Sequence, residues 1–229
     1  MTRNAFRTAA LAAIALATAG AGCGEFLENP VLPTSFGSSI HVLDEGSGQE
    51  WGQELFPVGE GDRWLYLDEG DEDRPWMTWQ SADTVEINGR PIPIWKMAGE
   101  SFTLDAWTEV TDDAVRDFGS VFALYACGVP RLHFPLRPGK RWETDCSDAG
   151  HTWTAAVKGL ERLRTDVGWF DAVRVEYGDL INGAGEPFTH TWWFVPGVGV
   201  VQREYEPGRF RLLRYASVAG RDVAGDLAE

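Results

Sequence analysis

The three cysteines are the residues of this sequence whose chemistry depends most on where the protein resides. Cys127 and Cys146 can form a disulfide under oxidising conditions, and closing this loop of about 20 residues would stabilise the domain by roughly 3 kcal/mol. They could instead be a reactive thiol and its partner. A structural disulfide is the default in an exported domain, so we predict a bridge between Cys127 and Cys146. Cys23 then remains for a different role.

The histidines and carboxylates have no spacing typical of a metal or catalytic site. His133, His151 and His190 are 18 and 39 residues apart, and the sequence has no H-E-x-x-H motif. The acidic stretch 68–73 lacks the spacing of a calcium-binding loop and is typical of a solvated hairpin loop. Motifs such as G-x-S-x-G, S-x-x-K and a Gly-rich phosphate loop before a helix are also missing. We therefore predict no catalytic residue, no metal and no cofactor.

Tryptophan offers the remaining candidates for binding chemistry, because the sequence contains 11 of them and many lie in expected strands. Trp192 and Trp193 are adjacent, so on a strand their side chains point to opposite faces. One of them could line an aromatic groove for a lipid, a glycan or a peptide. The alternative is that these rings fill the core of a sheet that few helices cover. Trp192 and Trp193 are the candidate ligand-binding residues.

Short β-branched and aromatic runs, separated by Gly, Pro, Asp and Asn, must position these side chains. Trp76–Trp79 and Thr84–Ile87 alternate with period two, and Asn88-Gly89 predicts a tight hairpin because both residues tolerate a positive φ. Further strands are expected at 102–110, 121–126, 141–145, 152–160, 170–177, 189–195, 199–205 and 210–217.

Two local signals interrupt this pattern. Pro91 and Pro93 indicate a sheet edge or a bulge, because proline cannot donate a hydrogen bond to a central ladder. The segment 112–119 is the only plausible helical turn, with Asp112 or Asp113 as its cap. The expected fold is therefore mainly β with little helix.

An internal repeat predicts how the strands are organised. Phe56–Trp64 and Phe134–Trp142 share the pattern F-P-[VL]-x-x-G-[DK]-R-W, and each is expected to turn and lead into a strand whose Trp faces the core. Duplication of a β-meander explains the repeat. We expect one domain over residues 51–218, with repeat units of about 51–130 and 131–218 and a tail at 219–229. Its antiparallel meander sheet would curl into a half-barrel or open barrel, which hides sheet edges.

The second half adds Val167–Val175 and Trp192–Val201, the latter ending in Gly-Val-Gly-Val-Val. With the F-P-x-x-x-G-x-x-W segments, these residues resemble a group of uncharacterised bacterial envelope lipoproteins that carry a domain of unknown function. The resemblance covers most of residues 52–217. It implies a β-rich, half-barrel fold and export, and it implies no reaction.

The N-terminus is typical of an export signal. Arg3 and Arg7 precede an apolar run over 9–19, which is too short to cross a bilayer because a spanning helix needs ~20 residues. The following Gly20-Ala21-Gly22-Cys23 resembles the lipobox of bacterial lipoproteins, although Gly20 stands where those proteins usually have Leu. The resemblance implies that residues 1–22 are removed and that Cys23 is lipidated, with acyl chains such as palmitate. Cleavage after Ala19 would instead give a secreted protein.

Charge limits the partners of the exported chain. Loss of Arg3 and Arg7 with the signal changes the formal charge from −15 to −17. Such an acidic body disfavours nucleic acid as a partner, because phosphate recognition needs a basic face. It would not adhere to an anionic membrane either, so the lipid on Cys23 would be the anchor and the Gly-, Ser- and Pro-rich residues 24–50 the flexible spacer.

These features predict a monomeric, lipid-anchored protein of the cell envelope that acts as a non-enzymatic binding or structural module. Its partners would be the membrane, through the N-terminal lipid, and an apolar ligand, a glycan or another envelope protein. Two alternatives remain open: a carrier of apolar ligands with a dry cavity inside the half-barrel, and an envelope hydrolase with dispersed acidic residues. The residues that line any interior cavity would distinguish them.

Overall fold

The computed structural model describes residues 42–43, 48–69, 71–100, 102–146, 151–181, 187–206 and 208–223. They all belong to the second of two compact units, Phe36–Glu229. The signal segment 1–22, the cleavage site at Ala19, the lipidation candidate Cys23, most of the spacer and residues 224–229 lie outside the described residues.

Almost all of the described chain is β-strand, and its one helical element is a short 3-10 turn. No helix in this part of the chain has the length and apolar character needed to cross a membrane. The elements are β1 (Val42–Leu43), η1 (Gln53–Leu55), β2 (Arg63–Asp68), β3 (Asp71–Ile87), β4 (Arg90–Gly99), β5 (Phe102–Val110), β6 (Ala114–Ser120), β7 (Ala123–His133), β8 (Arg141–Cys146), β9 (His151–Thr165), β10 (Gly168–Ile181), β11 (Pro187–Val195), β12 (Gly199–Glu206), β13 (Arg209–Val218) and β14 (Arg221–Asp222).

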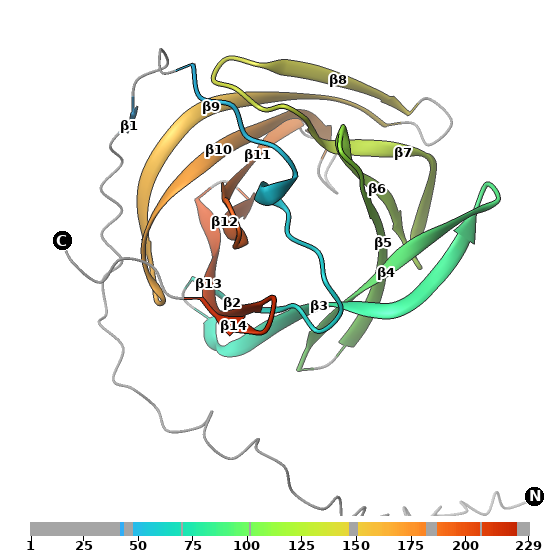
Figure 1. The fold of residues 1–229 in the computed structure, drawn as a ribbon, viewed down its shortest axis with the longest axis horizontal. Coiled ribbons are helices and arrows are strands. Elements are labelled where there is room, and N and C mark those ends of the chain that lie inside the picture. Colours follow the sequence, from blue (N-terminus) through green and yellow to red (C-terminus); the bar gives the residue numbers. More distant parts are fainter. Residues whose placement is uncertain are drawn as a thin grey trace, which may run out of the picture. The chain divides into compact units, whose positions relative to one another are not determined.

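The strands form one antiparallel sheet that curls until it is nearly a closed barrel (Figure 1). Strands β2 to β7 are neighbours in chain order, as are β9 to β13, and β8 pairs with β9. The pairing of β13 with β2 joins these two meanders into a single sheet. The expected antiparallel, curled meander sheet is therefore confirmed, while the duplication of two units stays a prediction.

Local sequence signals account for the hairpin between β3 and β4. Asn88 and Gly89 have φ values of 53° and 73°, and Ile87 lies opposite Arg90, as expected for a tight turn. Pro91 and Pro93 pair with β3, but the ladder between β4 and β5 begins only at Ile94. The two prolines thus lie where one side of β4 is unpaired, which confirms the predicted edge.

The helical turn predicted over 112–119 is wrong, because Ala114–Ser120 is strand β6. The capping signals are used in a turn instead: the Thr111 hydroxyl donates to Asp113 Oδ1, and the Ala114 amide donates to the same hydroxyl at 3.2 Å. Val115 and Phe118 are fully or almost fully buried. Burial of these side chains in the sheet outweighs a weak local helix preference.

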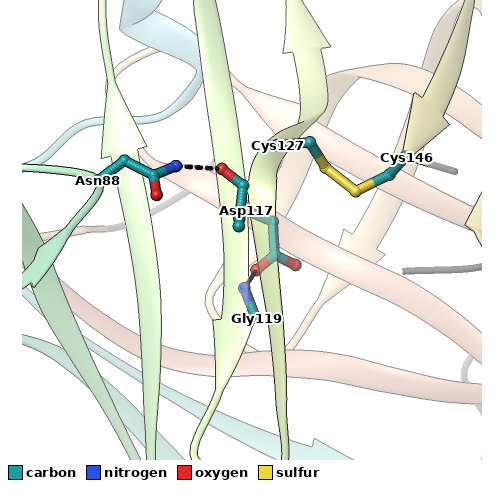
Figure 2. The surroundings of a disulfide bond; sticks show 6 residues. Asn88, Asp117, Gly119, Cys127 and Cys146 are labelled. Carbon is teal, nitrogen blue, oxygen red and sulfur yellow. Dashed lines mark hydrogen bonds between the residues drawn. A yellow bond between two sulfur atoms is a disulfide. The ribbon is translucent and has the colours of Figure 1, made fainter. Parts of the chain in front are cut away.

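The seam of the barrel lies between β7 and β8, which form no ladder with each other in the described part of the chain. A disulfide joins Cys127 on β7 to Cys146 on β8 across it, with 5.9 Å between the Cα atoms (Figure 2). The Trp142 indole also donates to the Pro130 carbonyl at 3.0 Å, and the Tyr177 hydroxyl donates to the Arg131 carbonyl at 2.9 Å. Covalent and side-chain contacts thus replace backbone pairing at this edge.

The core consists of two large buried clusters and one small one. Trp51 and Leu55 belong to the first large cluster, Trp64 belongs to the second, and Phe56 packs against both. Trp64 and Trp142, the last residues of the two repeated segments, are 3% and 8% exposed. The expectation that both face the core is confirmed.

The disulfide provides a test of the seam. Because it closes a loop of 19 residues, the double variant Cys127→Ser/Cys146→Ser should lose about 3 kcal/mol of unfolding free energy and roughly 6–12 °C in melting temperature. Thermal denaturation of both proteins, with and without reductant, measures this loss. Reductant should lower the melting temperature of the wild type and leave that of the variant unchanged. Two titratable free thiols at these positions in the native protein would contradict the assignment.

Candidate functional site

The curled sheet encloses a cavity of about 310 Å³. This volume is at the lower end of the range for small-molecule sites, ~300–1,000 Å³. Most of the lining is aromatic or aliphatic, with three arginines, one aspartate, one histidine and two threonines among it. The lining residues are Phe56, Pro57, Trp64, Tyr66, Trp76, Thr78, Trp95, Met97, Ala106, Thr108, Val115, Asp117, Arg131, His190, Trp192, Gly199, Val200, Arg203 and Arg211.

Strand alternation explains why these side chains meet. Strands β2 to β6 each contribute two residues at positions i and i+2, for example Trp64 and Tyr66 from β2, and such residues share one face of a strand. On the other side, Trp192 of β11 lies opposite Arg203 of β12, which in turn lies opposite Arg211 of β13. The cavity is thus built from the inward faces of both meanders.

In the view of Figure 1, the segment from η1 to β2 passes across the opening that the ring of strands surrounds. Leu55 is completely buried, and the Gly197 amide donates to the Glu54 carbonyl at 2.7 Å, which fixes this segment to the turn between β11 and β12. Phe56 and Pro57 then contribute to the cavity lining. The segment before β2 therefore covers part of the interior with apolar surface.

Two of the three cavity arginines are paired with carboxylates. Arg131 Nε donates to Asp117 Oδ2 at 2.9 Å, while Asp117 Oδ1 accepts the Gly119 amide at 2.7 Å (Figure 2). Arg211 donates to both carboxylate oxygens of Asp68, with its Nη2 at 2.8 Å from Oδ2. Asp68 thus differs from the expectation of a solvated acidic loop, because it ends β2 and faces Arg211 across the sheet.

Arg203 has no such partner among the described residues. It makes no ion pair with a described carboxylate, and its Nε, which is buried, donates no hydrogen bond. Burial, and after it the charge of the neighbouring Arg211, lower the pKa of Arg203 to about 10. Both causes disfavour the charged guanidinium, so the cavity holds a cation that the described part of the protein leaves uncompensated.

Tryptophan rings flank all three guanidinium groups. The Trp192 ring centroid is 5.3 Å from the Arg131 guanidinium and 5.6 Å from that of Arg203, and Arg211 lies 3.6 Å from the Trp76 centroid. These distances are within the range of cation–π attraction. A guanidinium over an aromatic ring can still donate hydrogen bonds from its edge.

The buried polar atoms of the lining that lack a hydrogen-bond partner in the described part are all donors. Besides Arg203 Nε, they are the indole nitrogens of Trp95 and Trp192. Tyr66 is different, because its hydroxyl donates to the Val200 carbonyl at 2.9 Å, and burial raises the pKa of this hydroxyl. The lining therefore has unused hydrogen-bond donors, which would suit a ligand that carries hydrogen-bond acceptors.

The two predicted ligand-binding residues have different environments. Trp192 lines the cavity, and its ring stands 5.8 Å from that of Tyr177. Trp193 lies on the opposite face of β11, is 5% exposed and donates from its indole to Glu161 Oε2 at 2.8 Å. Trp193 is thus a core residue of the second cluster, whereas Trp192 lines the cavity, and ligand binding by either residue stays a prediction.

The histidines and acidic residues that could have formed a metal or catalytic site do not come together in the described part of the structure. The described residues contain no group of three or more His, Cys, Asp or Glu side chains that could hold a metal. His190 lines the cavity, His133 is the last residue of β7, and the side chain of His151 lies outside the described part. The arginines were missed as site residues from the sequence, because nothing in the pattern distinguishes them from surface arginines.

Comparison with known proteins found similarity only to solved structures. No family model and no curated protein matches it. Two crystal structures are similar: a predicted exported protein with a YmcC-like fold from Bacteroides fragilis and a predicted lipoprotein from Parabacteroides distasonis. The TM-scores are 0.41 and 0.37; in both cases the identity is 14%, and the match covers 71% of this chain and 98% of the other. Both likenesses are partial, and the function proposed below rests on residues of this chain.

Proposed function

We propose that this protein binds an apolar or amphipathic small molecule inside its curled sheet. The observation that carries the proposal is the cavity of about 310 Å³, lined mainly by aromatic and aliphatic side chains with a few convergent polar groups. The apolar side chains of the lining are in contact with solvent there, and their removal from water would favour the binding of an apolar ligand.

The lining favours binding over hydrolysis. A hydrolase with acidic residues needs a carboxyl group that can exchange a proton with the substrate or attack it. Asp117, the carboxylate of the lining, is in an ion pair with Arg131, and Asp68, which lies next to the lining residue Arg211, is in an ion pair with that arginine. Both groups are thereby committed to neighbouring side chains, so the carrier alternative takes precedence over a hydrolase.

The same proposal includes export and anchoring. Residues 1–22 would direct export, and acylated Cys23 would hold the protein at the membrane, while the residues up to about 50 would act as a flexible tether. The disulfide between Cys127 and Cys146 supports this placement, because such bonds persist in oxidising compartments. We propose that the protein acts as a monomer.

Binding of a neutral apolar probe tests the cavity. N-phenyl-1-naphthylamine should bind the purified protein with increased fluorescence, and Ala106→Phe should weaken binding by roughly tenfold or more, because Ala106 lines the cavity and the added ring occupies it. Ala123→Phe is the matched control, because Ala123 is exposed on β7. No binding to the wild type, or an equal loss in both variants, would contradict the proposal.

Anchoring has a separate test. Mass spectrometry of the protein purified from membranes should show a chain that begins at an acylated Cys23, and Cys23→Ser should release the protein from the membrane fraction. Arg3 and Arg7 should be missing from the mature chain. A chain that begins at Gly20 with an unmodified Cys23 would instead show secretion after cleavage at Ala19.

A further inference from the structure

We infer that the ligand of this cavity carries an anionic group with oxygen acceptors, such as a carboxylate, and that Arg203 binds it. The inference rests on the proposed function, because it assumes that the cavity is a ligand site. It adds the chemical class of the ligand: an apolar body with one acidic end.

The charge balance of the interior is the first argument. Arg131, Arg203 and Arg211 line the cavity, and Asp117 is the one carboxylate among the lining residues. Asp117 is bonded to Arg131, and Asp68, which ends β2 outside the lining, is bonded to Arg211. Arg203 is the one left over. This excess of positive charge occurs inside a chain whose formal net charge is −15. A cation removed from water without a counter-charge is costly, so a ligand anion would provide what the described residues lack.

The position of Arg203 in the sheet increases this cost. Arg203 lies directly opposite Arg211 across the β12–β13 ladder, and like charges in that position destabilise a sheet. Asp68 lies opposite Arg211 on the far side, where it receives both hydrogen bonds from that arginine. An anion beside Arg203 would therefore extend the alternation of charge along the row from Asp68 to Arg211 to Arg203.

The unmet hydrogen bonds point to the same chemistry. Every buried lining atom without a described partner is a donor, on Arg203, Trp95 or Trp192. The Arg203 guanidinium also lies over the Trp192 ring, 5.6 Å from its centroid, within the range of cation–π attraction. A planar guanidinium suits the paired oxygens of a carboxylate or phosphate better than an ammonium does. The rest of the lining, with Phe56, Met97 and Val115, would contact the apolar body of the ligand.

Matched ligands test the inference with the full mature protein. Dodecanoate, dodecyl phosphate and dodecanol share one alkyl chain and differ in the head group, and each can displace N-phenyl-1-naphthylamine from the cavity. We expect at least one acid to bind the wild type roughly 10- to 100-fold more tightly than the alcohol, the range expected for hydrogen bonds to a charged group. The acid that gains most identifies a carboxylate or a phosphate as the preferred group.

Two variants assign the effect to Arg203. Arg203→Gln should bring the ratio of acid affinity to alcohol affinity close to one, whereas Arg221→Gln, which removes an exposed charge on β14, should keep the wild-type ratio. Arg203→Met should melt at the same temperature as the ligand-free wild type or higher, because it removes an uncompensated charge. The acid should raise the melting temperature of the wild type and not that of Arg203→Met.

The outcomes separate the two proposals. Equal affinity of the wild type for acid and alcohol, or an acid preference that survives in Arg203→Gln, overturns the inference and leaves the apolar site in place. A lower melting temperature of Arg203→Met without ligand also overturns it, because it would show that Arg203 stabilises the fold. Failure of all three compounds and of the neutral probe to bind overturns the proposed function itself.

Discussion

The pairing of β13 with β2 is the contact on which the rest of this structure depends. It joins strands from opposite ends of the domain, and the ion pair between Asp68 and Arg211 within it links residues 143 positions apart. The cavity takes lining residues from β2 to β7 and from β11 to β13, so neither meander could form it alone. Closing so long a loop costs chain entropy, and the buried second cluster, which contains Trp64 of β2 and Leu213 of β13, offsets that cost.

This pairing also sets the electrostatics of the interior. Because Asp68 ends β2 opposite Arg211, it neutralises that arginine and leaves Arg203, one strand further on, without a carboxylate among the described residues. The seam lies on the other side of the barrel. The disulfide between Cys127 and Cys146 joins the two strands there, and Arg131 next to the seam donates to Asp117. Arg131 beside the seam is thus paired with a carboxylate, whereas Arg203 on the other side forms no ion pair with a described carboxylate.

The sequence predicted those features that depend on a few neighbouring residues. The Asn88-Gly89 turn and the edge at Pro91 and Pro93 follow from backbone preferences that act over two or three positions. The failure at 112–119 has the same origin, because the capping signal of Asp113 is local and the burial of Phe118 in the sheet is not. Trp192 was a candidate from the sequence, but the choice between Trp192 and Trp193 needed the curvature of the sheet.

The arginines show most clearly why a site can escape sequence reasoning. The ladder between β11 and β12 shifts register near Val201, so Val200 lies opposite Phe194 while Arg203, three positions later, lies opposite Trp192. Strict alternation would place Val200 and Arg203 on opposite faces, and the bulge puts both in the cavity lining. By itself, the sequence predicted the β-rich class and the pairing of the cysteines, which the structure confirms, because these rest on local patterns and on cysteine parity. The export and lipidation signals rest on local patterns too, and they stay predictions. Only the tertiary structure decided that a cavity exists and which charges meet there, because both depend on register and curvature between strands far apart in the chain.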